Sequence, residues 1–289
     1  MVLGVIMVNL KELKSIDLAS YTIITTAIAV LFSIISSIIL VVGIGITSPQ
    51  AIGGVIYIIS TIIVGTLMYT VYNSFCQGFL YNFLTKKINT IKIAFKDDKE
   101  IVKVSPTETS IVISMIITIQ VILLYLVSVF LFPLFVNSII QTLMYSGQQL
   151  LAYSLYQFLI LLSQPTTVAM IIFGTFIITF VFVLLGCYIY NILASTGRGA
   201  IVTLSSQDNM TAIDSVDVLK LAIVFAVVGG VLNLILALIT LISGGNIMFS
   251  LGNIIGGFIG AFIEGALLAI FYNFLAPKLG KLKLELIDQ

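Results

Sequence analysis

Long apolar stretches with almost no charged residues dominate this sequence, and they constrain its fold more than any other feature. Each is at least about twenty residues long, which is the length that an α-helix needs to cross roughly 30 Å of hydrocarbon. They lie at about 21–42, 51–87, 111–132, 168–192, 219–242 and 252–276. Charged residues make up 9% of the chain, against roughly a quarter in a soluble domain. We therefore expect an all-α polytopic membrane protein, with residues 1–289 forming a single membrane domain.

A Tyr-Asn signature recurs near the end of three of these helices. The three copies are Tyr81-Asn82-Phe83-Leu84, Tyr190-Asn191-Ile192-Leu193 and Tyr272-Asn273-Phe274-Leu275. A β-favouring segment begins ten residues after each tyrosine, at Ile91, Ala200 and Leu282. The helix pairs also begin with residues that are typical helix N-caps, namely Asp17, Ser105 and Asp217. This agreement in order and spacing predicts three helix-hairpin repeats with pseudo-threefold symmetry, at approximately 10–95, 101–204 (with an insertion at 133–166) and 212–288.

Short alternating segments between the repeats predict β-structure outside the bilayer. Residues 91–95 and 101–104 flank a charged loop and are expected to form a hairpin. The segments 200–204 and 212–216 are expected to pair in the same way. In both hairpins, the strand after one repeat pairs with the strand before the next repeat. If the third repeat follows the same rule, the strand 282–286 should pair with the strand 10–16 near the N-terminus. The insertion at 133–166 carries no charge and is expected to be interfacial or partly re-entrant.

The distribution of positive charge predicts the orientation. All lysines and the arginine lie on the side of the predicted strands, whereas opposite turns such as 43–50 carry no charge. The positive-inside rule then places the strands and both termini in the cytoplasm, with the helices in the cell membrane. The N-terminal segment lacks a basic start and a small-residue cleavage site, so it is not expected to be a signal peptide. The basic face is expected to bind anionic lipid or a protein partner.

Glu264 is the single carboxylate within a predicted membrane span. A charge at that depth costs at least about 2.5 kcal/mol, so this side chain should face protein or water, or be protonated. Two interpretations stay open: Glu264 binds an ion or proton, or it is a neutral group that holds helices together. The equivalent positions in the other repeats are Asn73 and Phe182, so a symmetric acidic ring is not expected. Asn73 is a second candidate for a polar site within the membrane.

Other sequence features point away from catalysis. The chain has no histidine, and its net charge of +1 gives no reason to expect nucleic acid as a partner. Cys76 and Cys187 lie far apart in apolar helices and are interpreted as buried hydrophobic residues. We expect no enzyme activity, no catalytic residue, no cofactor and no metal site. Small residues at near-regular spacing predict close helix packing in the last helix, at Gly252, Gly256, Gly260 and Gly265.

The last repeat resembles a small two-helix transmembrane family of unknown function that is known mainly from actinobacteria. The residues that carry the resemblance are Ser215-Val216-Asp217-Val218-Leu219-Lys220, the helix from Gly256-Gly257 to Tyr272-Asn273-Phe274-Leu275-Ala276, and Gly280-Lys281-Leu282. Gly280-Lys281 replaces the Gly-Gly that the family pattern has at this place. The resemblance implies the two-helix fold and, because the family has no established activity, no chemistry.

Two functions from different classes follow as hypotheses. The first is a non-catalytic scaffold or accessory membrane subunit, because most helices lack polar residues that could line a path. The alternative is a small channel or transporter with a site near Glu264 on the pseudo-threefold axis, because internal repeats often place substrate sites at their interface.

Overall fold

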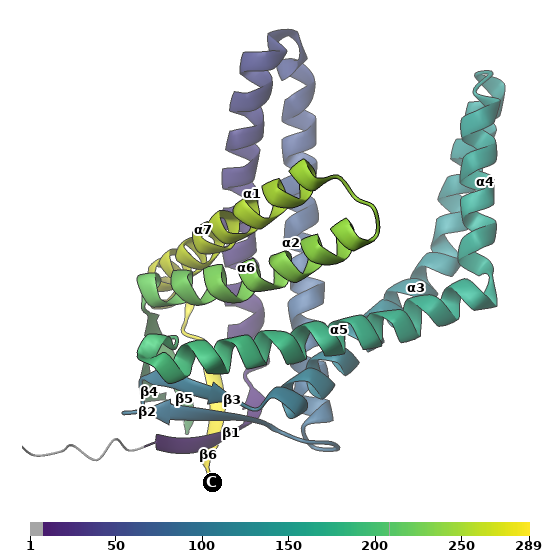
Figure 1. The fold of residues 1–289 in the computed structure, drawn as a ribbon. Coiled ribbons are helices and arrows are strands. Elements are labelled where there is room, and N and C mark those ends of the chain that lie inside the picture. Colours follow the sequence, from purple (N-terminus) through teal and green to yellow (C-terminus); the bar gives the residue numbers. More distant parts are fainter. Residues whose placement is uncertain (1–7, 208) are drawn as a thin grey trace, which may run out of the picture. The chain divides into compact units, whose positions relative to one another are not determined.

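The computed structural model, which describes residues 8–207 and 209–289, is mostly helical and contains a six-stranded antiparallel sheet (Figure 1). The helices are α1 (Leu18–Thr47), α2 (Ile52–Leu84), α3 (Pro106–Tyr145), α4 (Gln149–Ser163), α5 (Pro165–Leu193), α6 (Val218–Ile242) and α7 (Ile247–Leu279). The strands are β1 (Val8–Ile16), β2 (Ile91–Lys96), β3 (Glu100–Val104), β4 (Val202–Gln207), β5 (Met210–Val216) and β6 (Lys283–Asp288). Residues 1–7, which belong to the segment judged not to be a signal peptide, lie outside the described residues.

The chain divides into two compact units. The first comprises Met1–Val112 and Leu184–Gln289, and it holds the sheet together with α1, α2, α6 and α7. The second comprises Ile113–Val183. In this second unit α3 continues through Pro133 to Tyr145, so the first part of the segment 133–166 extends a long helix. The rest of that segment is mainly α4, which is tied to α3 by a 2.9 Å hydrogen bond from the Tyr125 hydroxyl to the Leu162 carbonyl.

Six helices in the described part of the chain are long and apolar enough to cross a membrane: α1, α2, α3, α5, α6 and α7. Their outer surfaces carry large apolar side chains, such as Ile39, Met68 and Ile259, which are 66%, 72% and 58% exposed. Apolar surface of this extent is stable in hydrocarbon and unfavourable in water. The six helices agree with the number expected from sequence and support a multi-pass membrane protein.

The strands form one sheet with the order β3-β2-β1-β6-β5-β4. The expected hairpins are confirmed as β2–β3 and β4–β5, and the expected pairing of β1 with β6 is confirmed, with Lys11 opposite Asp288 and Leu13 opposite Leu286. The expectation of an all-α fold with short hairpins is correct in the mostly helical content, but it misses the extent of the β-structure. Because β1 also pairs with β2, and β5 with β6, the hairpins join into a continuous sheet.

The two edge strands of this sheet also meet. The Ile101 N–H donates to the Ala200 carbonyl, and the Val202 N–H donates to the Lys99 carbonyl, both at 2.9 Å. These bonds frame an antiparallel bridge between Glu100 and Ile201. The bridge closes the sheet on itself, so that the backbone groups of β3 and β4 are paired at this point instead of being open to another chain.

Gly199 permits this closure, and we expect Gly199→Ala to weaken it. A Cβ at this position would collide with the Ile101 carbonyl oxygen, which accepts the hydroxyl of Tyr190. The two strands would have to move apart. Hydrogen exchange of the Ile101 and Val202 N–H groups should therefore accelerate in Gly199→Ala. Gly65→Ala is the control because a Cβ at Gly65 meets nothing within 4 Å. Equal exchange in both variants would show that the bridge tolerates a side chain.

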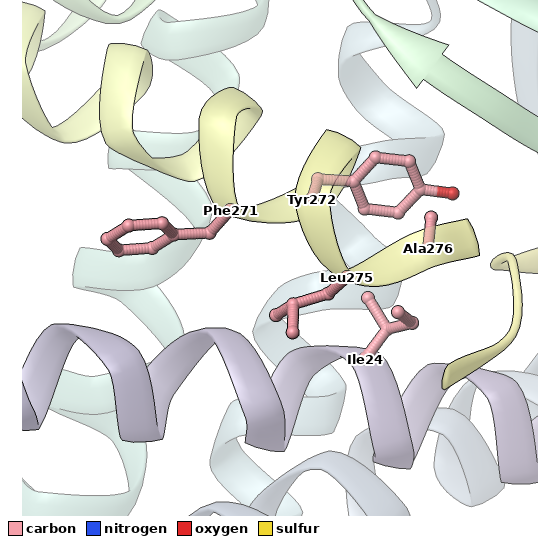
Figure 2. Packing of buried hydrophobic residues seen from close by; sticks show 5 residues of the cluster. All are labelled: Ile24, Phe271, Tyr272, Leu275 and Ala276. Atoms are coloured by element: carbon pink, nitrogen blue, oxygen red, sulfur yellow. The ribbon is translucent and has the colours of Figure 1, made fainter. Parts of the chain in front are cut away.

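A cluster of buried apolar residues lies between α1 and α7. Figure 2 shows Ile24 of α1 pointing toward Leu275 and Ala276 of α7, and all three side chains are buried. Farther along, the rings of Phe32 and Phe271 meet edge to face with their centroids 5.0 Å apart. This contact fixes α7 against the helix that follows β1, in agreement with the pairing of β1 and β6.

Ion pairs on the sheet make its stability sensitive to acid. The Lys11 ammonium lowers the pKa of Asp98, the Lys14 ammonium lowers the pKa of Glu12, and the Lys281 ammonium lowers the pKa of Asp214, in each case by a hydrogen bond. The Lys281 ammonium, just after the end of α7, lies 2.7 Å from the carboxylate of Asp214 in β5, so this ion pair links the helix end to a strand.

We expect the sheet to lose stability as the pH falls below about 4, the range of unperturbed carboxyl pKa values. A carboxyl group with a lowered pKa in the folded state stabilises that state above its unfolded pKa, and this contribution disappears as the pH falls through the folded pKa. Thermal unfolding between pH 7 and pH 3 measures the effect, which should be small because these ion pairs are still partly open to solvent. Asp214→Asn should flatten the profile, and an unchanged profile would contradict a role for this pair.

Candidate functional site

The side-chain amide of each signature asparagine makes two hydrogen bonds to the backbone of a single residue. The side-chain oxygen accepts that residue's N–H, and the side-chain nitrogen donates to the same residue's carbonyl. The bound residue is in each case the one just before the helix cap. The pairs are Asn82 with Ile16, Asn191 with Val104, and Asn273 with Val216, and all of these hydrogen bonds are 2.8 Å long.

Each tyrosine of the signature also binds the backbone on two sides. Its hydroxyl donates to a carbonyl four residues before the cap: Tyr81 to Leu13 at 2.6 Å, Tyr190 to Ile101 at 2.6 Å, and Tyr272 to Ile213 at 2.5 Å. The same hydroxyl accepts the N–H of the residue ten positions after the tyrosine, which is Ile91, Ala200 or Leu282. The signature therefore joins each helix end to two strands.

The helix caps are confirmed at two of the three predicted positions. Asp17 and Asp217 accept the N–H of Ser20 and Lys220, both at 2.8 Å. Ser105 is not used in this way, since its hydroxyl accepts the N–H of Lys92 at 3.1 Å. The equivalent N–H on β6, that of Lys283, bonds to the Ser20 hydroxyl at 3.1 Å, and this leaves Asp17 free to cap its helix.

These contacts assign structural roles to the signature. The side chains of Tyr81 and Tyr272 are 4% and 5% exposed, and their polar atoms are occupied by backbone partners. Buried polar groups with satisfied hydrogen bonds stabilise a fold, whereas they are costly when a partner is removed. This geometry is consistent with a structural role for the signature, although Tyr190 also lines the candidate cavity described next.

Glu264 lines a cavity of about 540 Å³ in the first unit. The cavity is formed by the end of α5, the middle of α6 and the middle of α7, and most of its lining is apolar or glycine. Its polar lining residues are Cys187, Tyr190, Asn233 and Glu264. Glu264 is exposed, and it has no hydrogen-bond or ion-pair partner among residues 8–207 and 209–289. The carboxyl group is thus available to a molecule that enters the cavity.

The second expected polar residue, Asn73, does not lie in this cavity. It is half-buried on α2 and has interactions of its own. The cavity instead contains Asn233, which the sequence reasoning missed, although an amide within an apolar run was a visible signal. Its side-chain nitrogen donates to the Gly229 carbonyl at 2.9 Å. Asn233 also packs on Gly257, where an added Cβ would lie 2.7 Å from the same nitrogen.

The glycines of α7 lie on two different faces. Gly257 and Gly265 pack against α6, and a Cβ at Gly265 would lie 2.7 Å from Phe225 Cβ. By contrast, a Cβ at Gly252, Gly256 or Gly260 would meet nothing within 4 Å. The expectation of close helix packing is therefore confirmed at Gly265, and within the described chain it is wrong for the other three.

The described part of the chain also contains no candidate metal site and no disulfide. No group of three or more His, Cys, Asp or Glu residues there could hold a metal ion, and Cys76 and Cys187 are not in a disulfide. The described residues form a mostly helical, multi-pass membrane protein with a closed antiparallel sheet and a largely apolar cavity that Glu264 lines. Comparison of the chain with protein-family models, curated proteins and solved structures finds no match.

Proposed function

We propose that the chain is a non-catalytic membrane scaffold or accessory subunit, built from three copies of one helix-pair unit with pseudo-threefold symmetry. The observation that carries this proposal is the recurrence of the same hydrogen bonds at three helix ends. Besides the Asn and Tyr contacts, the N–H of each cap residue donates to a strand carbonyl: Asp17 to Lys283, Ser105 to Lys92, and Asp217 to Ile201, at 2.9–3.0 Å. Each unit would correspond to one copy of the two-helix family that the last repeat resembles.

The arrangement suits a scaffold because polar groups are used to fix helix ends. A sheet that is closed and bonded to each helix pair holds the helices in defined positions, as a protein that organises partners requires. The sheet is proposed to face the cytoplasm, since exposed cations lie beside it at Lys86, Lys87 and Arg198. Lys278 lies 3.4 Å from the centroid of the exposed Phe274 ring. Such a cation beside an aromatic ring fits the headgroup level, where anionic lipid or an acidic partner would bind.

Crosslinking in native membranes tests the scaffold proposal. The full chain, crosslinked with a short amine-reactive reagent and purified, should yield one partner at a fixed ratio, identified by mass spectrometry. The purified chain in phosphatidylcholine vesicles should conduct no ions above the level of protein-free vesicles. An isolated chain without a stoichiometric partner, together with specific ion flux, would contradict the scaffold function.

A small channel or transporter is the second candidate. The observation that favours it is that Glu264 and Asn233 line the same cavity, so that a carboxylate and an amide face one space within the helices. Transport would require proton or cation flux in the same vesicles, and Glu264→Gln should abolish it. Flux that is equal in the variant and the wild type would exclude Glu264 as the transport site.

A further inference from the structure

Glu264 lies near the middle of α7, far from any aqueous end of the helix. It is fourteen residues before Lys278, which corresponds to about 21 Å along an α-helix. A carboxyl group at this depth without a partner in its own unit is unfavourable next to lipid. Its exposure therefore points to an occupant that supplies the missing interaction.

A glycine face continues from Glu264 along the same side of α7. Gly260, Gly256 and Gly252 precede it at intervals of four residues, which places all four positions on one side of the helix. No atom lies within 4 Å of a Cβ built on any of these glycines. We call this surface, made of Gly252, Gly256, Gly260 and Glu264, the open face of α7. Glycines at this spacing allow the backbone of a second helix to approach closely.

The chain itself offers no cation at the depth of Glu264. No Lys or Arg occurs in residues 18–85, in residues 109–197 or in residues 221–277. A second copy of this chain would therefore bring another Glu264 and no positive charge into the contact. Charge complementarity must come from a different molecule.

We propose that the open face of α7 docks a transmembrane helix of another protein, one that carries a lysine or arginine at the depth of Glu264. The inference rests on the proposed accessory-subunit function and names the chemistry of its partner. Glycines let the helices pack closely, and the ion pair neutralises a carboxylate that otherwise faces hydrocarbon. Val228 and Gly186, which also line the cavity, complete the apolar surface beside the docked helix.

A synthetic single-span helix provides the probe. The full chain is reconstituted in phosphatidylcholine vesicles with a labelled Leu-Ala helix that has one central Lys, or with the same helix carrying Leu at that position. Energy transfer should show at least tenfold tighter association of the Lys helix. Glu264→Gln should remove this preference, and Gly256→Leu should weaken the binding of both helices. Gly65→Leu on α2 is the control, because Gly65 is equally open, and it should bind as the wild type does.

Three results would overturn the inference: equal binding of the two helices, a Lys preference that persists in Glu264→Gln, or self-association of the chain that competes with the Lys helix. The last would identify a second copy as the occupant. The scaffold function is tested separately by the native complex. If that complex forms with Glu264→Gln and Gly256→Leu as it does with the wild type, the accessory role stands and the proposed docking face is wrong.

Discussion

Replacing Asn273 by leucine is expected to lower the free energy of unfolding by about 3–5 kcal/mol, because two hydrogen bonds are lost and two backbone groups lose their partners. Asn273 binds both the N–H and the carbonyl of Val216 at 2.8 Å, and leucine can replace neither bond. Thermal or denaturant unfolding in detergent, followed by circular dichroism, measures the difference.

The matched control is Asn253→Leu. Asn253 lies on the same helix but is exposed, and it has no hydrogen-bond partner in the described part of the chain. Its replacement should change stability by less than about 0.5 kcal/mol, as at most surface sites. If the two variants unfold alike, the contacts of the signature asparagine are not what holds the helix end to the sheet. Asn273→Asp, which keeps an acceptor but loses the donor, should fall between them.

The second large effect is expected for Gly265→Leu, which should separate α6 from α7. A Cβ at Gly265 would already lie 2.7 Å from Phe225 Cβ and 3.0 Å from the Leu221 carbonyl oxygen, so a larger side chain cannot be accommodated without movement of the backbone. Overpacking typically costs about 1–3 kcal/mol, and we expect a loss at the upper end of this range here. The melting temperature of the purified chain reports the loss.

Gly256→Leu is the control on the same helix, because its Cβ points into open space. It should melt close to the wild type, although it fills the open face of α7. Equal destabilisation by the two substitutions would show that the assignment of glycines to a packed face and an open face is incorrect.

Local patterns in the sequence predicted the elements that depend on neighbouring residues. The hairpins follow from alternation around a charged loop, and the caps Asp17 and Asp217 follow from carboxylates placed just before apolar helices. The pairing of β1 with β6 followed from the predicted repeat pattern. These features need only short-range information or a comparison of the chain with itself.

Features that depend on which elements meet in space were not predictable in the same way. The alternation of polar and apolar residues identifies a strand, but it does not show which strand lies on its other side. The joining of the hairpins into one closed sheet was therefore missed. The spacing of the glycines did not reveal which of them face α6, because that depends on the rotation of α7 against its neighbour. Ser105 was assigned as a cap because serine is a typical N-cap residue. Nothing in the sequence shows that the Lys92 N–H donates a hydrogen bond to its hydroxyl.

The pairing of β1 with β6 has a consequence for chain connectivity. The Gln289 N–H donates to the Leu10 carbonyl at 3.0 Å, so a short linker could join these two ends of the described chain. Because β1 pairs with β6 and β3 meets β4 at a bridge, the two ends of the described chain lie inside the sheet and not at an open edge. A circular permutant opened in the tight β2–β3 turn at Asp97-Asp98, and joined between residues 289 and 8, should therefore fold and span the bilayer as the original does. The difference in melting temperature between the permutant and the parent would measure how far stability depends on the order of the elements along the chain.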